Sequence, residues 1–245
     1  MVTLGAELWR DVLPALDTEP VPIKIEPAIE APPAARPQWN LERFEQEQIR
    51  GLVRQVFFPG WPRPAKQVVF CGIDEQVDTH PVCMQVGKAL ATHLPAAVAV
   101  VEADAAGIDS YGGTTNECGR SVELCASLRT SSRQIQDNLW LVNRQGFTSS
   151  RKRREGSTWL RDRMGQLRRE FDFAVVQAPP AAIYSDAALL GQFADGVVLV
   201  VRANATRKAS ARKIQELLAA ANVRLLGVVL SERTFPVPER LYRSL

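Results

Sequence analysis

The sequence lacks any apolar run of the roughly 18 to 20 residues that a membrane-spanning helix requires. Its opening residues carry neither the basic region nor the apolar core of a secretory signal peptide, so we expect a cytoplasmic protein. The four cysteines, Cys71, Cys83, Cys118 and Cys125, show no CxxC spacing, which favours reduced thiols. Cys71, His80 and Cys83 match no recognised zinc spacing, and no metal site is predicted.

The sequence also lacks a large excess of charge of either sign, since the net charge of the chain is only +3. Residues 1–36 hold six acids and three bases, which leaves a modest excess of +6 for the remainder. The basic run at 151–155 and the arginines after it alternate with acids, and no aromatic platform accompanies them. A nucleic-acid surface is therefore not expected.

Proline divides the chain into two parts. Apolar residues at helical spacing open the sequence, and a proline-rich stretch follows them. We interpret residues 1–39 as a short amphipathic helix with a flexible tether, and residues 40–245 as one folded domain. Within that domain an amphipathic helix is predicted directly after Asn40.

Short apolar runs rich in valine alternate with helical patterns in the rest of the chain. The predicted strands are 67–72, 96–103, 138–142, 171–177, 195–203 and 223–230, and the predicted helices are 82–93, 157–170 and 208–221. Nearly continuous apolar strands are typical of a sheet that helices cover on both faces. The fold class is therefore α/β, with a doubly wound and mostly parallel sheet. Function is expected at the carboxyl ends of the strands, in the loops after Cys71, Ala103, Gln177 and Arg202.

The segment from Gln67 to Leu90 predicts a buried strand, a loop and a helix, which is the architecture of a phosphate-binding loop. Such a loop needs glycines, a lysine for the phosphates and a Ser or Thr for Mg²⁺. Here the loop offers Gly72 but no lysine, and it contains several acids.

A purely structural interpretation of the same loop needs no ligand. Asp78 or Thr79 can cap the following helix, and Pro81 suits the first helical turn. His80 has no obvious orienting partner in the sequence, which favours an incidental role over acid–base chemistry.

Residues 171–232 contain an Ala-Pro-Pro, a Ser-Asp-Ala, an Asp-Gly before a strand, a Val-Arg-Ala and a Leu-Gly-Val-Val strand. The members of this pattern are Asp186, Asp195, Gly196, Arg202, Thr206, Arg207 and Gly227. In this order the motifs resemble the MinD/ParA-like P-loop ATPases, and within them the bacterial tyrosine autokinases of capsule and exopolysaccharide biosynthesis. The resemblance implies a P-loop NTPase-like fold.

The resemblance also implies where a nucleotide site would lie and how this chain departs from it. Thr79 stands at the lysine position, and Gln177 replaces the aspartate that would hold the Mg²⁺ shell. The altered nucleotide-binding positions are Gly72, Asp78, Thr79, His80, Pro81, Glu102, Asp104 and Gln177. No catalytic residue is assigned.

The predicted helix after Asn40 resembles the oligomerisation helix of the autokinases at Glu47 and Arg50, but Val53 replaces a second arginine. A homo-oligomer is one implication. An ordinary ion pair between residues three apart on one helix explains the same two residues.

The leading hypothesis is a non-catalytic regulatory or scaffold subunit of exopolysaccharide or capsule biosynthesis, without a cofactor. The resemblance implies a membrane-embedded chain-length regulator as its partner, which would place the chain at the inner face of the membrane. Two alternatives stay open. One is an active autokinase or ATPase that binds Mg-ATP through Glu102 and Asp104, and the other is a ParA-like positioning protein on DNA. Tyr111, Tyr184 and Tyr242 are the only tyrosines, so a tyrosine-rich tail for self-phosphorylation is absent.

Overall fold

The computed structural model describes residues 41–60, 64–103, 127–148 and 157–232. The predicted helix and tether of residues 1–39 lie outside these residues, as does Asp104. The division into a tether and a domain therefore stays a prediction.

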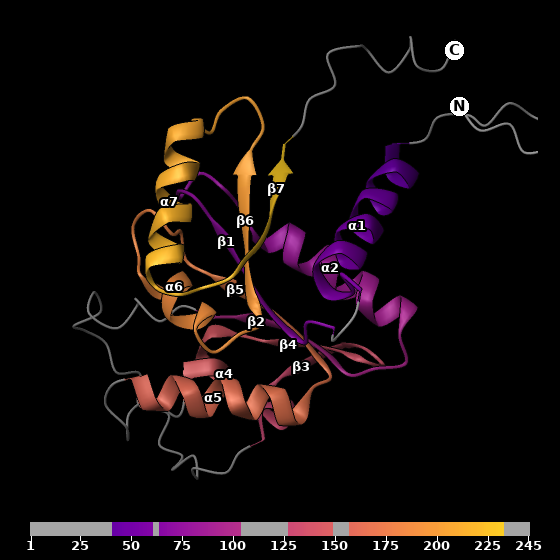
Figure 1. The fold of residues 1–245 in the computed structure, drawn as a ribbon. Coiled ribbons are helices and arrows are strands. Elements are labelled where there is room, and N and C mark those ends of the chain that lie inside the picture. Colours follow the sequence, from indigo (N-terminus) through magenta and orange to yellow (C-terminus); the bar gives the residue numbers. More distant parts are fainter. Residues whose placement is uncertain (1–40, 61–63, 104–126, 149–156, 233–245) are drawn as a thin grey trace, which may run out of the picture. The chain divides into compact units, whose positions relative to one another are not determined.

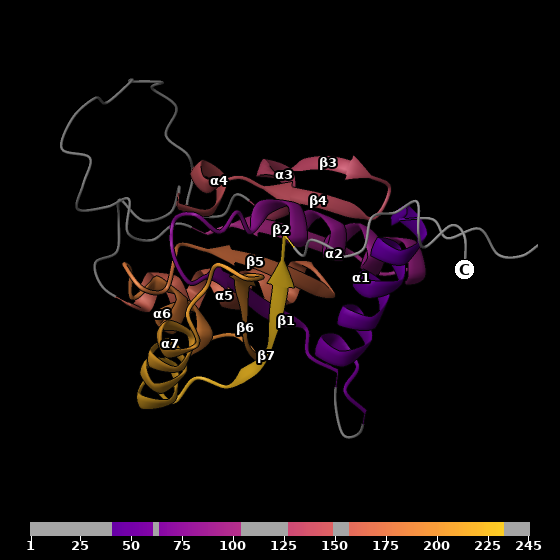
Figure 2. The same ribbon diagram turned by 90° about the horizontal axis from the view of Figure 1, so that it is seen from above.

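A seven-stranded sheet forms the centre of the domain (Figure 1). Its strands are β1 (Gln67–Gly72), β2 (Val98–Glu102), β3 (Arg133–Gln136), β4 (Leu139–Val142), β5 (Phe173–Ala178), β6 (Gly196–Arg202) and β7 (Leu225–Ser231). Their order across the sheet is β3-β4-β2-β5-β1-β6-β7, so β3 and β7 lie at its two edges (Figure 2). All neighbouring strands are parallel except the β3–β4 hairpin.

Two apolar layers cover the two faces of the sheet. Along β1, Val68 and Phe70 pack toward α1 (Leu41–Phe57) and α2 (His80–His93). Val69 and Cys71 point to the other face, which α5 (Ser157–Glu170), α6 (Asp186–Gly191) and α7 (Lys208–Ala220) cover. Because both faces of β1 are buried, its sequence after Gln67 carries no polar side chain and shows no alternation with polar residues.

The predicted fold class is confirmed as a mostly parallel, doubly wound sheet with helices on both faces. The helix predicted from residue 82 begins two residues earlier, at His80, because proline is accommodated within the first turn. Short elements escaped prediction: α3 (Leu128–Ser131), α4 (Arg144–Thr148), α6 and the edge strand β3. None of the helices in the described ranges is long and apolar enough to cross a membrane.

Gly87 positions α2 closely against the sheet. A Cβ atom at this residue would lie 2.4 Å from Val100 Cγ2 on β2, so any side chain here would force the helix away from the strand. The close packing of α2 on β2 at Gly87 therefore helps to position the N-terminus of α2 at the carboxyl ends of the strands.

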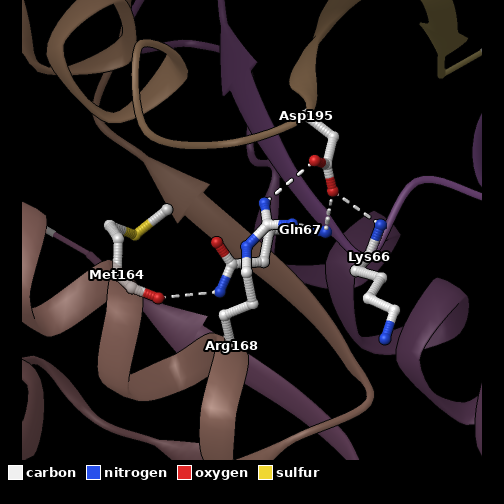
Figure 3. Close-up of polar contacts among 5 residues, drawn as sticks. All are labelled: Lys66, Gln67, Met164, Arg168 and Asp195. Carbon is white, nitrogen blue, oxygen red and sulfur yellow. Dashed lines mark hydrogen bonds and ion pairs between the residues drawn. The ribbon is translucent and has the colours of Figure 1, made fainter.

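Asp195 joins three elements at the edge of the sheet where the parallel strands begin (Figure 3). Its Oδ2 accepts hydrogen bonds from the backbone N–H groups of Lys66 at 2.6 Å and Gln67 at 2.8 Å. Its Oδ1 accepts from Arg168 Nη2 on α5 at 2.9 Å. The buried Gln67 side chain adds a bond from Nε2 to the carbonyl oxygen of Met164, also on α5. The start of β1 is thus tied to the start of β6 and to α5.

Replacing this carboxylate tests the junction. Burial raises the pKa of Asp195, but the hydrogen bonds from Gln67, Arg168 and Lys66 outweigh burial and hold the pKa below its ordinary value of 3.8. We expect Asp195→Asn to lower the free energy of unfolding at neutral pH by about 1–3 kcal/mol, measured by urea denaturation followed by circular dichroism.

The pH dependence follows from the direction of the shift. A carboxylate with a lowered folded-state pKa contributes its full stability above the unfolded pKa and loses it as the pH falls through the folded value. The difference between wild type and Asp195→Asn should therefore shrink below about pH 4. Asp137→Asn, in the exposed β3–β4 turn, is the matched control. An equal loss of stability in both variants would contradict the assigned role.

Candidate functional site

The carboxyl ends of the parallel strands bring most of the predicted site residues together. Gly72 ends β1, Glu102 ends β2 and Gln177 lies near the end of β5. Glu102 and Gln177 are register partners on neighbouring strands. Arg202 ends β6 on the other side of β1. The loop 73–79 and the start of α2 therefore lie at the carboxyl ends of the central strands.

His80 lies between the two acceptors that β2 and β5 supply. Its Nδ1 is 3.3 Å from Gln177 Oε1 and 3.7 Å from Glu102 Oε1. Because both neighbours are oxygen acceptors, Nδ1 is a ring nitrogen that carries a proton in this arrangement. The prediction that His80 has no orienting partner is therefore wrong. The sequence hides the contact because Glu102 and Gln177 come from distant strands.

The exposure of the pair limits what it contributes. The side chains of His80 and Glu102 are 44% and 35% exposed, so an ion pair between them is worth little in water. The contact orients the imidazole ring more than it stabilises the fold.

Asp74 closes the first half of the loop on itself. Its Oδ1 accepts a hydrogen bond from the Gln76 N–H at 3.1 Å, and its carbonyl oxygen accepts from the Val77 N–H at 3.2 Å. The Ile73 N–H donates to the Val200 carbonyl of β6 at 3.3 Å. Three backbone donors of the loop are thus already used within the protein.

Asp78 performs the same role at the start of α2. Its Oδ1 accepts from the His80 N–H at 2.9 Å, so Asp78 bonds the first N–H of the helix from the position before the N-cap. Thr79 occupies the N-cap position and is buried, but its side chain makes no capping bond. Pro81 lies in the first turn, as predicted. Thr79 is therefore the N-cap by position, whereas Asp78 supplies the side-chain bond at the helix start.

The space directly above β1 is filled by the loop itself. A Cβ atom at Gly72 would lie 3.0 Å from Val77 Cβ and 3.3 Å from the carbonyl oxygen of Asp74. The carbonyl oxygens of Gly72 and Ile73 accept hydrogen bonds from the N–H groups of Ala181 and Ala182, at 2.9 and 3.0 Å. The loop is therefore packed down on the strand and held by the segment after β5.

Arg202 contacts the loop, although it was not among the predicted nucleotide-binding positions. Its Nη2 donates to Gln76 Oε1, and its Nη1 lies 4.0 Å from Glu232 Oε2. Its Nε is buried without a hydrogen-bond acceptor in the part of the chain that the structure describes. The turn after β6 holds the residue, since the Arg202 N–H donates to Thr206 Oγ1 at 3.0 Å. The sequence signal that could have identified Arg202 as a site residue is its position at the carboxyl end of a predicted strand.

The cysteines near the site belong to the core. Cys71 and Cys83 are fully buried. Burial raises the pKa of Cys71 to about 12, and burial together with Cys71 and Asp78 raises that of Cys83 as well. Within the described ranges, no three His, Cys, Asp or Glu side chains are grouped closely enough to hold a metal ion.

Glu47 and Arg50 lie on α1 and contact each other, with Arg50 Nη1 2.6 Å from Glu47 Oε1. The pair matches the ordinary ion pair that the sequence allowed, and the assignment to oligomerisation stays a prediction.

Comparisons with known proteins agree with this architecture. No protein-family model matches the chain. The tyrosine-protein kinase YwqD of Bacillus subtilis (strain 168) is 33% identical over 75 residues, which is 31% of this chain and 32% of the kinase. The match therefore spans less than one third of the length of that kinase.

Solved structures cover more of the chain. The kinase domain of the Escherichia coli tyrosine kinase ETK superposes with a TM-score of 0.54 at 20% identity and covers 79% of each chain. The VpsO kinase domain gives a TM-score of 0.56 at 17% identity, covering 79% of this chain and 98% of its own. The BceF tyrosine kinase domain gives 0.55 at 16% identity and 76% of each chain. The chain therefore has the fold of bacterial tyrosine kinase domains and resembles one such kinase in part of its sequence.

Proposed function

We propose that this protein is a non-catalytic, kinase-like regulatory or scaffold subunit of exopolysaccharide or capsule biosynthesis. The observation that carries the proposal is the state of the loop after β1. Asp74 and Asp78 use their carboxylates to bind the backbone N–H groups of Gln76 and His80, the kind of donor that a phosphate would need. The carboxylates of the loop thus occupy backbone donors that a phosphate ligand would otherwise use.

The charges near the loop oppose a nucleotide further. The loop and the end of β2 carry Asp74, Glu75, Asp78 and Glu102, and the arginine that the structure shows in contact with the loop is Arg202. A carboxylate about 4 Å from a phosphate charge costs about 4 kcal/mol at an effective dielectric constant of 20. The loop has no lysine to offset this repulsion, and Gln177 brings no charge to Mg²⁺. Mg-ATP, the cofactor that the resemblance implies, does not fit these residues.

The proposed partner is a membrane-embedded chain-length regulator, which would bring the chain to the inner face of the membrane. The support for this part is the resemblance to the autokinases and the shared fold with their kinase domains. The helices on both faces of the sheet are present, while the loop after β1 is closed by its own hydrogen bonds. A domain of this kind suits a role in binding other proteins.

The alternative, an ATP-binding autokinase with unusual residues, draws on one observation. His80 is oriented by Glu102 and Gln177, and Arg202 at the end of β6 has a buried Nε without an acceptor among the described residues. These groups would supply an imidazole and a guanidinium to a phosphate if the loop opened.

Titration calorimetry with Mg-ATP separates the two functions. For the full chain we expect no heat of binding at millimolar nucleotide and no shift of the melting temperature, because the N–H groups of Gln76 and His80 are already bonded. An active bacterial tyrosine kinase domain serves as the positive control. Saturable heat that disappears in Arg202→Gln would reject the proposal and favour the alternative.

A stability measurement tests whether the loop is built as a structural cap. Asp78→Ala should lower the free energy of unfolding by about 0.5–2 kcal/mol, because the capping bond to the His80 N–H is lost. Glu75→Ala removes an exposed acid of the same loop and should leave stability within about 0.5 kcal/mol of wild type. A stabilised Asp78→Ala protein would instead indicate that Asp78 is kept for binding at the expense of stability.

A further inference from the structure

A cavity of about 410 Å³ opens between α1 and α2, away from the candidate site. It lies toward the C-terminal ends of both helices, whereas the candidate site lies at the N-terminus of α2. At 1.5 Å per residue, the 14 residues of α2 separate the two places by about 20 Å.

The floor of the cavity is apolar. Val53 of α1 and Leu90 of α2 are buried there, and Leu94 is partly buried where α2 ends. Phe58 forms part of the wall with 39% of its surface exposed, and its ring is held against Phe173 at a centroid distance of 5.7 Å. The volume lies in the range that accommodates a large apolar group.

The polar residues of the described lining are all of basic types. Among the residues that the structure describes, Arg50, Arg54 and His93 line the cavity, and no acid does. Arg50 is already engaged, with its Nη1 2.6 Å from Glu47 Oε1 and its Nε donating to His93 Nε2 at 3.2 Å. Because a guanidinium only donates, His93 Nε2 is the acceptor and the His93 proton sits on Nδ1.

The third polar residue of the described lining is Arg54, in the last turn of α1. Its side chain makes no hydrogen bond or ion pair with any residue in the described ranges. The carbonyl oxygens at the end of α2 do not require it either, since Asn138 Nδ2 donates to those of Ala91 at 2.8 Å and Leu94 at 3.0 Å. An unpaired guanidinium beside an apolar cavity is complementary to a carboxylate next to an apolar side chain.

We propose that this cavity docks a short acidic peptide segment of a partner protein. A bulky apolar side chain of the segment enters between α1 and α2, and a neighbouring Asp or Glu pairs with Arg54. The inference deepens the proposed function, which requires a partner surface, but its chemistry is independent of the phosphate loop. Large apolar anchors beside arginine are the usual centres of such interfaces.

The test uses phage-displayed random dodecapeptides selected on the full chain. We expect enrichment of sequences that place a Trp, Phe or Leu next to Asp or Glu. A synthetic peptide of the enriched sequence should bind Arg54→Glu about tenfold more weakly or worse by fluorescence anisotropy. Replacing the acid of the peptide by Lys should restore binding to Arg54→Glu, which a general loss of folding could not do.

Arg169→Glu is the matched control, because Arg169 is also an exposed arginine in the last turn of a helix, α5, and has no side-chain bond within the described residues. It should bind the peptide like wild type. Absence of acidic enrichment, or equal binding by wild type and Arg54→Glu, would overturn the inference. Nucleotide binding in calorimetry together with an Arg54-dependent peptide would reject the proposed function and leave this pocket standing.

Discussion

The parallel pairing of β1 with β5 on one side and β6 on the other is the constraint on which the molecule depends. It buries β1 completely and fixes both ends of the strand. At its start, Asp195 ties the backbone of β1 to α5. At its end, the chain must leave the sheet between the ends of β5 and β6, so the loop acquires neighbours from both. His80 meets Gln177 on the β5 side, and Gln76 meets Arg202 on the β6 side.

The same loop explains how a framework for phosphate binding and a closed structure coexist. A P-loop presents its N–H groups outward because glycines allow the required turns. Here aspartates direct the turns instead, since their side chains bond to the N–H two residues ahead. The substitution changes the direction of the donors without disturbing the strand before the loop or the helix after it.

Sequence patterns predicted the framework well because burial imposes them. The valine-rich runs at β1 and β6 and the helical spacing in α5 each require a buried face, and this is visible in one chain. The short helix α6 and the edge strand β3 lack that signal, since six or four residues give too few repeats of any period.

Within the site, the local features were predictable and the distant contacts were not. The helix start at Asp78 and Pro81 follows from neighbours in the sequence. The contact of His80 with Glu102 and Gln177 depends on strands that are 22 and 97 residues away along the chain and become neighbours only in the folded sheet. Arg54 next to an apolar cavity was hidden for the same reason, because Leu90 and His93 of α2 contribute to the lining.

An anion that is covalently part of a loop differs from one that arrives by diffusion. Every copy of the loop carries its own Asp74 and Asp78. The bonds that these side chains make therefore do not depend on the concentration of a metabolite. On the proposed function, a loop held by nucleotide would respond to the ATP supply of the cell, whereas this loop is held by its own aspartates. On the proposed function, the amount of protein made, and not the ATP level, would then govern how much of it is ready to act.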